Sequence, residues 1–285
     1  KGVALTGRLA DEGVARALSS LRRFRALCQQ IGCKQVFAVA TAAAREASNG
    51  KDFIRLAEEA VGERISVLSG KEEARYAAIG VVAGIPEADG IVGDLGGGSL
   101  ELIDVKDGEL RDGITLPLGP LRLIDMSGGS MKRARTIVGE YLDQAKILKN
   151  LQGRSFYAVG GTWRNLARLH MAQSKYPLHV LHHYTMSSSQ AAGVADLVAG
   201  LSSSSLREVR SISRSRYETL PGGALVLNEL LARSKAKNVV ASVFGVREGL
   251  LFSKLPRRKM EADALLSSCW DFARRYARSP AHELE

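Results

Sequence analysis

Residues 91–102 read Ile-Val-Gly-Asp-Leu-Gly-Gly-Gly-Ser-Leu-Glu-Leu and are the strongest signal in the sequence. Two strand-like runs flank three consecutive glycines, which have no Cβ atoms, so several backbone N–H groups can converge on one anion. Strand alternation places Ser99 and Glu101 on one face, and Asp94 ends the incoming strand beside the turn. A carboxylate there can hold Mg²⁺, usually through water, against phosphate oxygens. The stretch predicts a phosphate-binding turn; a glycine-rich hairpin without a ligand is the simpler alternative.

The segments around this turn alternate between strand and helix patterns. A helix is expected over 12–31, where apolar residues recur at helical spacing and Gly32 follows as a stop signal. Before the turn we expect strands at 35–40, 64–68 and 90–95 and helices at 51–61 and 71–82. After it, strands 99–105 and 109–116 flank a Lys-Asp-Gly turn signal and predict a β-meander. The remaining expected elements are helices at 130–149, 162–170, 189–201, 217–232, 246–252 and 262–276 and strands at 155–159 and 238–243. This alternation predicts an α/β protein.

Composition limits the class of protein further. The chain has 285 residues, 45% of them hydrophobic, so disorder is excluded and its length favours two domains. No uncharged run approaches the roughly 18 apolar residues of a membrane span, so no membrane partner is expected. No leader signature opens the sequence, and the three cysteines are an odd set in periodic or apolar segments. These features favour a reducing cytoplasm.

The positive charge of the chain is concentrated. There are 40 Lys and Arg against 30 Asp and Glu, and residues 206–260 alone hold twelve Lys and Arg against four Glu. A concentrated field of one sign attracts anions, so this segment favours a polyanionic or highly phosphorylated ligand. An ordinary solvated face is the alternative.

Residues 69–75 read Ser-Gly-Lys-Glu-Glu-Ala-Arg and lie at a strand-to-helix junction. Glu72 and Glu73 open the helix, where the helix dipole stabilises ionised carboxylates. Successive helical positions diverge by about 100°, so we expect one of the two to enter a cleft as a base and the other to be a bystander. Ordinary N-terminal helix acids are the alternative interpretation.

Two further segments offer phosphate contacts. Thr41 and Arg45 follow the strand 35–40 at its carboxyl end, where open α/β sheets bind ligands. Residues 158–162 read Ala-Val-Gly-Gly-Thr, a strand followed by a glycine pair and a helix start. Gly160, Gly161 and Thr162 can therefore present N–H groups to another phosphate. A plain tight turn with Thr162 as the helix N-cap fits these residues equally well.

Taken in this order, the four segments resemble the exopolyphosphatase and guanosine pentaphosphate phosphatase family of the actin-like ATPase superfamily. The resemblance runs from Thr6 to about Leu251, and its most specific feature is the segment 69–75 with Asp94 following 21 positions after Glu73. It implies an α/β fold of two actin-like (ribonuclease H-like) domains flanking a cleft, at 1–82 and 83–254. Residues 255–285 are then a linker and a C-terminal helix, a remnant of the helical third domain of other members.

The sequence departs from the family pattern in its first residues. Members usually begin with a strand-turn-strand that carries Asp-x-Gly-Ser-Asn-Ser, and no such segment precedes Thr6. The first domain is therefore expected to lack its N-terminal strands and half of the phosphate clamp, either because this sequence omits residues or because the protein is a truncated form.

The resemblance also implies a reaction and roles. Water attacks the terminal phosphoanhydride of inorganic polyphosphate, or converts guanosine pentaphosphate to the tetraphosphate, with Mg²⁺ as cofactor and no covalent phosphoenzyme. Glu73 activates the water, Glu101 assists around the metal or water, and Asp94 positions Mg²⁺. The terminal phosphate is held by Gly96, Gly97, Gly98 and Ser99, and the phosphate chain contacts Thr41 and Arg45. The superfamily resemblance favours a homodimer.

Three other functions are compatible with the sequence. A sensor that binds polyphosphate or an alarmone without hydrolysing it would keep the glycine turns and the basic segment. An ATP-dependent kinase of the same superfamily would transfer the phosphoryl group to a sugar or an acid. Nucleic-acid binding is suggested by the sequence pI of about 9.7, but only 6% of residues are aromatic and no recognition module is present, so no nucleic-acid partner is expected.

Overall fold

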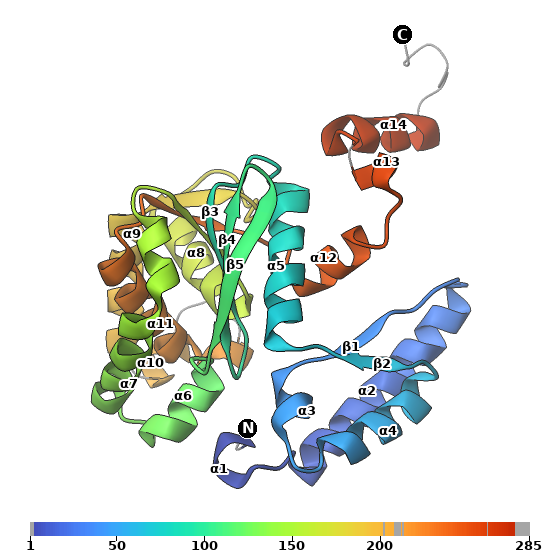
Figure 1. Cartoon of the computed structure of the whole chain (residues 1–285), viewed down its shortest axis with the longest axis horizontal. Helices are drawn as coiled ribbons and strands as arrows, with labels where there is room; N and C mark the ends of the chain where they lie inside the picture. The colour runs from blue at the N-terminus through green and yellow to red at the C-terminus, as the bar shows by residue number, and fades with distance from the viewer. Residues whose placement is uncertain (1–2, 202, 208–211, 213, 261, 277–285) are drawn as a thin grey trace.

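The computed structural model describes residues 3–201, 203–207, 212, 214–260 and 262–276. Its main body contains a six-stranded sheet of order β5-β4-β3-β6-β8-β7 (Figure 1). Three central strands are parallel: β3 (Gly90–Leu95), β6 (Ser155–Val159) and β8 (Asn238–Ala241). The other three run antiparallel to their neighbours: β4 (Leu100–Lys106), β5 (Glu109–Leu116) and β7 (Tyr184–Ser187). The predicted α/β class and the β-meander that follows the glycine turn are confirmed.

Alternation along the strands gives this sheet two apolar faces. On one face, Ile91, Leu100 and Phe156 pack against a layer of helices: α7 (Met131–Gln144), α8 (Gly161–Gln173), α9 (Ser188–Gly200) and α11 (Leu220–Ser234). On the other face, Val92 and Tyr157 pack against the alanine-rich side of α5 (Gly70–Gly84). The central strands are therefore buried on both faces, as expected for parallel strands in an α/β protein.

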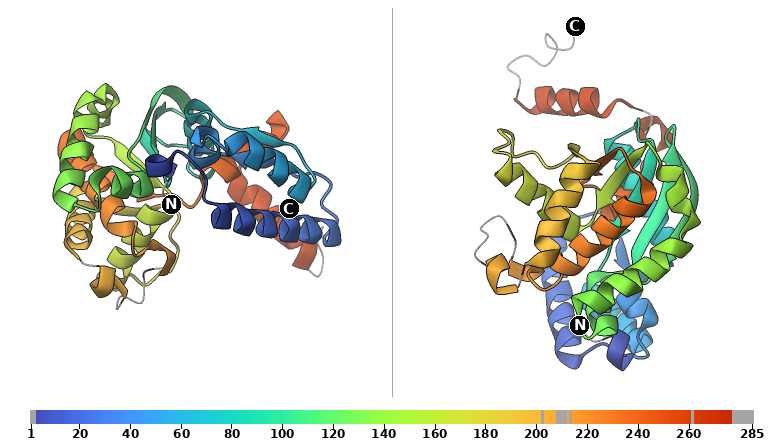
Figure 2. Two further views of the ribbon diagram at one scale, coloured as in Figure 1. Left: turned by 90° about the horizontal axis from the view of Figure 1, so that it is seen from below. Right: turned by 90° about the vertical axis from the view of Figure 1, so that its left-hand side faces the viewer.

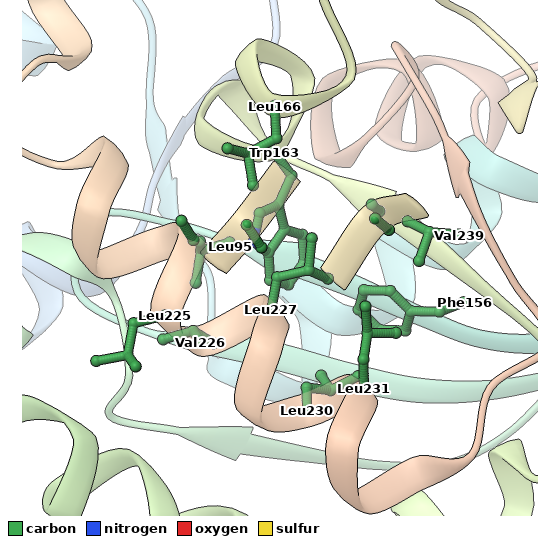
Figure 3. Close-up of a cluster of buried hydrophobic side chains, with 14 of the residues drawn as sticks. Leu95, Phe156, Trp163, Leu166, Leu225, Val226, Leu227, Leu230, Leu231 and Val239 are labelled. Atoms are coloured by element: carbon green, nitrogen blue, oxygen red, sulfur yellow. The ribbon is translucent and has the colours of Figure 1, made fainter. Parts of the chain in front are cut away.

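Trp163 anchors the first turn of α8 to the sheet. Its side chain is 1% exposed, its indole N–H donates to the Gly223 carbonyl at 2.9 Å, and its ring meets Phe156 edge-on at 5.3 Å. Figure 3 shows Trp163 in the cluster of buried hydrophobic side chains, together with leucines of α11. This packing fixes the start of α8, and with it the Gly160-Gly161 turn, at the carboxyl end of β6.

Helix α5 is held from its other side by α12 (Val246–Phe252), and glycines permit the close approach. A Cβ added at Gly249 would lie 1.8 Å from the Tyr76 carbonyl oxygen, and one at Gly80 would lie 2.4 Å from that of Gly245. No side chain fits in this crossing. Helix α5 is therefore fixed between the sheet and α12, which sets the position of its first turn.

A smaller unit lies beside the first turn of α5. It consists of the parallel pair β1 (Ala38–Ala40) and β2 (Ile65–Val67) with α2 (Asp11–Gln30) and α4 (Gly50–Val61) (Figure 1). Two short helices, α1 (Val3–Thr6) and α3 (Ala42–Glu46), lie between this unit and the main body. Helix α5 packs on the larger sheet, although the predicted division at residue 82 groups it with the smaller unit. The predicted domain bounds stay predictions.

Several predicted elements need correction. The strand expected at 35–40 is only Ala38–Ala40, and the helix expected at 130–149 leaves helical geometry at Ala145, with ψ of 77°, and continues as a 3₁₀ segment, Lys146–Leu151. Strand β7 and the helix α6 (Pro120–Ser127) were not predicted. Both are short, and α6 is marked only by Pro at its first position and by Gly128 in the left-handed region after its end.

The C-terminal residues extend from the main body. The expected linker contains the helix α13 (Arg257–Met260), and the expected last helix is α14 (Ala264–Tyr276), which stands apart from the main body in Figure 1 and in the right view of Figure 2. Arg210 of the basic segment and residues 277–285 lie outside the described residues. None of the described helices combines the length and the apolar character that crossing a bilayer requires.

Candidate active site

Three carboxylates, one from α5 and two from neighbouring strands, lie in the region between α5 and the carboxyl end of β3. Asp94 and Glu101 are directly opposite each other in the antiparallel β3–β4 pair, so their side chains leave the same face of the sheet. That face is the one covered by α5, because Val92 and Ile103 on the same side pack with it. Glu73 comes from the first turn of α5 and is close enough for its charge to act on both strand carboxylates. Strand alternation and one helix terminus thus build an acidic group.

The two adjacent acids of α5 have different environments. Glu72 closes a capping box: its carboxylate accepts from the Ser69 N–H and hydroxyl at 2.8 Å each, and the Ser69 hydroxyl accepts from the Glu72 N–H at 3.3 Å. These hydrogen bonds hold the pKa of Glu72 below its ordinary value. Glu73, one position further, is 7% exposed and faces the cleft. Glu73 therefore faces the cleft, whereas Glu72 caps the helix.

Arg45 forms an ion pair with Glu73. Its guanidinium donates to the Glu73 carboxylate and to the Leu68 carbonyl oxygen. Burial raises the pKa of Glu73, while Arg45 and the Ala42 N–H act against this rise. Arg45 therefore positions a carboxylate in this structure, whereas the sequence analysis expected it to contact the phosphate chain.

The strand carboxylates hold protons more tightly than ordinary acids. Burial and the charge of Glu73 raise the pKa of Asp94 to about 6, although Arg164 opposes the shift. Burial also raises the pKa of Glu101 to about 8, with Asp94 and Glu73 adding to the rise and a hydrogen bond from Ser99 opposing it. Glu101 is 2% exposed, and its Oε1 has no hydrogen-bond partner among the described residues. A buried oxygen without a hydrogen-bond partner is a suitable place for a bound ion or water.

The raised pKa of Glu101 predicts a pH-dependent stability. Between its ordinary value of 4.5 and about 8, the folded protein keeps a proton that the unfolded chain has lost, so stability falls as the pH rises through this window. In the presence of EDTA, we expect the free energy of unfolding to fall between about pH 5 and about pH 8, and to fall less in Glu101→Gln. Urea denaturation followed by circular dichroism measures both slopes. Equal slopes for the two proteins would contradict this origin.

The glycine turn offers unused donors. The Gly96 N–H donates to the Ser99 carbonyl at 3.0 Å and closes the turn, but the N–H groups of Gly97 and Gly98 have no acceptor in the part of the chain that the structure describes. The start of α6 fixes the turn, because the Leu121 N–H donates to the Gly97 carbonyl at 3.0 Å and a Cβ at Gly119 would lie 2.4 Å from the Gly98 nitrogen. A fixed turn whose N–H groups are available to a ligand suits an anion.

Packing within the protein requires glycine neither at Gly96 nor at Gly98. Neither Gly96 nor Gly98 has a positive φ, and a Cβ would approach other atoms no closer than 3.5 Å at Gly96 and 3.7 Å at Gly98. Both contacts are ordinary van der Waals distances. The space that the missing side chains leave therefore suits a molecule that binds here.

The glycine turn and Glu73 line a cavity of about 160 Å³ between the smaller unit and the main body. Of the residues predicted for the site, those that line it are Thr41, Glu73, Gly96, Gly97, Gly98 and Ser99. Asp94, Glu101 and Arg45 are linked to Glu73 by charge or hydrogen bonds but do not line the cavity. The structure thus brings the glycine turn and Glu73 together at one cavity, with the other three residues adjoining it through Glu73.

Two lining residues were missed by the sequence analysis. Arg122 on α6 lines the cavity and pairs with Glu46 at the end of α3, which also lines it. The two positions are 76 residues apart, and Glu46, although it follows the predicted Arg45 directly, was given no role. An arginine beside a glycine turn is well placed to bind phosphate oxygens. In this structure its guanidinium is paired with the Glu46 carboxylate.

The second glycine turn is only partly as expected. Gly160 has φ of +108°, and a Cβ there would lie 2.6 Å from the Leu95 carbonyl oxygen, so the backbone itself requires glycine. A Cβ at Gly161 would lie 2.6 Å from the Arg216 guanidinium, which places a cation beside the start of α8. Thr162 is 2% exposed and packs on Gly223 of α11, so it lies in the core and away from the cavity.

The donor set suits a hard divalent cation better than zinc. In the described ranges, no three His, Cys, Asp or Glu side chains gather closely enough to hold an ion together. Asp94 and Glu101 nevertheless offer carboxylate oxygens side by side, one of them unpartnered among the described residues. Mg²⁺ is commonly bound by one or two carboxylates with water and phosphate oxygens completing its shell. The residues present therefore fit Mg²⁺.

Together, the two α/β units, the cleft between them and the glycine turn facing a buried carboxylate define an actin-like protein that handles phosphoryl groups. Within that class, the chain belongs to the Ppx/GppA phosphatase family, whose sequence model matches residues 1–258.

Individual relatives agree with this assignment. Exopolyphosphatase 1 of Mycobacterium leprae is 29% identical over 265 residues, which cover 88% of this chain and 77% of that protein. The crystal structure of an exopolyphosphatase-like protein superimposes with a TM-score of 0.82 at 26% identity, and that of the Ppx/GppA family member of Aquifex aeolicus with 0.72 at 25%. Each alignment covers 92% of this chain and 87% of the other.

Proposed function

We propose that this protein hydrolyses the terminal phosphoanhydride of inorganic polyphosphate. One observation carries the proposal: the N–H groups of Gly97 and Gly98, which lack an acceptor among the described residues, share a cavity with the buried carboxylate of Glu73. The N–H groups can hold the oxygens of a terminal phosphate. The carboxylate can orient water for attack on its phosphorus from the side opposite the rest of the polyphosphate. Relatives that are named exopolyphosphatases support polyphosphate as the substrate.

The residues have distinct roles in this reaction. Backbone N–H groups fixed by α6 stabilise charge on the phosphoryl oxygens without reorganising, which is the main catalytic requirement of phosphoryl transfer. Glu73, held by Arg45, accepts a proton from the attacking water. Arg122 binds phosphate oxygens once they displace Glu46, and Thr41 offers a hydroxyl on the other side of the cavity.

Asp94 and Glu101 are the residues that would hold Mg²⁺. The bound ion supplies neutralisation of phosphate charge. Its positive charge would also favour the ionised form of both carboxylates, so each would lose its proton when the site is filled. The Oε1 atom of Glu101 is buried and has no hydrogen-bond partner among the described residues, which supports this assignment.

Release of orthophosphate tests the proposal. We expect the protein to release orthophosphate from long-chain polyphosphate in Mg²⁺ and to lose this activity in EDTA. Guanosine pentaphosphate presents the same terminal group, and we propose it as a second substrate with the tetraphosphate as product. Binding of both compounds without release would show a sensor. Phosphoryl transfer from ATP to a sugar or an acid would show a kinase.

The homodimer and the cytoplasmic location that the sequence analysis favours stay predictions. So does the expected absence of a nucleic-acid partner. None of the three is needed for the chemistry at the cavity.

A further inference from the structure

The end of α2 brings two cysteines together. Cys28 lies in the last turn of this helix, and Cys33 follows three residues after its end. Between them, Gly32 has φ of 66°, in the left-handed region. The Gly32 N–H donates to the Gln29 carbonyl oxygen at 3.2 Å, and the Cys33 N–H donates to the Cys28 carbonyl oxygen at 2.9 Å. This pair of bonds is the Schellman motif, in which the side chains of the two residues joined by the longer bond commonly touch.

The backbone hydrogen bond limits how far apart the two cysteines can lie. Because backbone bond lengths are fixed, the N···O distance of 2.9 Å places the two Cα atoms at most about 7 Å apart, within the reach of a disulfide. Burial raises the pKa of the Cys28 thiol, and a hydrogen bond with the Cys33 thiol and the charge of that thiol add to the rise. The two sulfur atoms therefore lie close to each other. The interval of five residues matches no common cysteine motif, so the helix end creates this proximity.

The two thiols differ in their access to solvent. Cys33 is exposed, whereas Cys28 is half-buried. A small reagent in solution therefore reaches Cys33 first, and Cys28 is close enough to displace the reagent afterwards. The third cysteine, Cys269, is exposed on α14 and belongs to a distant part of the sequence.

We propose that Cys28 and Cys33 form a site of reversible oxidation by low-molecular-weight disulfides such as oxidised glutathione. The Cys33 thiolate attacks one sulfur of the reagent, which breaks the reagent's S–S bond and releases one thiol. The Cys28 thiolate then attacks the Cys33 sulfur of the mixed disulfide, forms the Cys28–Cys33 bond and releases the second thiol. The two cysteine sulfurs are oxidised, the reagent is reduced, and the two cysteine protons end on the two released thiols.

This oxidation would fix the connection between α2 and β1. The new bond would join the last turn of α2 to residues that lead into β1, and Thr41 of the cavity directly follows β1. In the reducing compartment that the sequence favours, such a disulfide would be transient and would respond to the balance of thiols and disulfides. The inference does not depend on the reaction at the cavity.

Thiol counting and intact-protein mass spectrometry test the proposal in the Cys269→Ser protein, which retains only the pair. Excess oxidised glutathione should lower the reactive thiols from two to none and leave no glutathione attached, and dithiothreitol should restore both. Adding Cys28→Ser or Cys33→Ser leaves one thiol, which should stop at the mixed disulfide with one glutathione attached. The protein that keeps the exposed Cys33 should react faster. Two unreacted thiols in the pair, or two attached glutathiones, would overturn the proposal.

A comparison with unfolded protein tests the role of the helix end. Equilibration of the Cys269→Ser protein with reduced and oxidised glutathione gives the equilibrium constant for closing the disulfide, in buffer and in concentrated urea. We expect the constant to be at least about tenfold larger in the folded protein, because the Schellman motif holds the thiols together, whereas the unfolded chain loses conformational entropy on closing the ring. An equal or smaller constant in the folded protein would contradict the pairing inferred from the motif.

Discussion

Replacing Glu73 with Gln should lower the turnover of polyphosphate by about 10²–10⁴-fold, the usual contribution of a general base. Glutamine has the same shape but accepts no proton from the attacking water. It keeps a carbonyl oxygen toward the Arg45 guanidinium, so the cavity should retain its form. Binding of the phosphate chain should therefore change little, because the glycine turn and Arg122 supply it. Orthophosphate release gives kcat, and calorimetry gives the affinity.

The neighbouring acid supplies a matched control. Glu72→Gln changes the same residue type one position earlier, but Glu72 is exposed and bonded to Ser69 in the capping box. We expect a modest loss of stability and a turnover close to that of the unmodified protein. If both variants keep full turnover, or if both lose it equally, Glu73 is not the base.

Replacing Gly98 with Ala should separate stability from activity. The folded protein has room for the methyl group, which would meet the Ala42 Cβ at 3.7 Å, and the backbone has an ordinary φ. Stability should stay within about 1 kcal/mol of the original value, since alanine also restricts the unfolded chain. The methyl group would enter the space offered to the phosphate, and we expect kcat/KM to fall about 10²–10³-fold, comparable to the loss of one oxyanion donor.

Another glycine tests whether this effect is local. Gly193 lies in α9, where a Cβ would meet nothing within 4 Å. Gly193→Ala should leave kcat/KM unchanged and stabilise the helix by about 1 kcal/mol. Thermal denaturation and steady-state kinetics of the two variants make the comparison. A fully active Gly98→Ala protein would show that the turn does not hold the reacting phosphate.

Local patterns predicted the bounds of three strands of the larger sheet. Strands β3, β5 and β6 begin and end where the sequence analysis expected, because apolar alternation and turn residues mark both ends. The same alternation put Asp94 and Glu101 at the glycine turn, and helix geometry separated Glu72 from Glu73. These relations involve residues close in sequence or opposite each other across a hairpin.

Pairings across the fold were not predictable in this way. Arg45 was predicted to contact the phosphate chain, but its orientation toward Glu73 depends on how α3 meets α5. Arg122 and Glu46 meet for the same reason. Thr162 looked like a phosphate contact because it follows two glycines, yet close packing of α8 on Gly223 buries it. Each outcome depends on how elements distant in sequence pack together, and local sequence patterns do not reveal that packing.

Mass spectrometry of orthophosphate released in ¹⁸O-labelled water tests hydrolysis at the terminal phosphorus most directly. With long-chain polyphosphate and Mg²⁺, every orthophosphate released by the unmodified protein should carry one ¹⁸O atom from water, and the shortened chains should carry none after a single turnover. Orthophosphate without the label, or a chain that is bound but never shortened, would contradict water attack at the glycine turn.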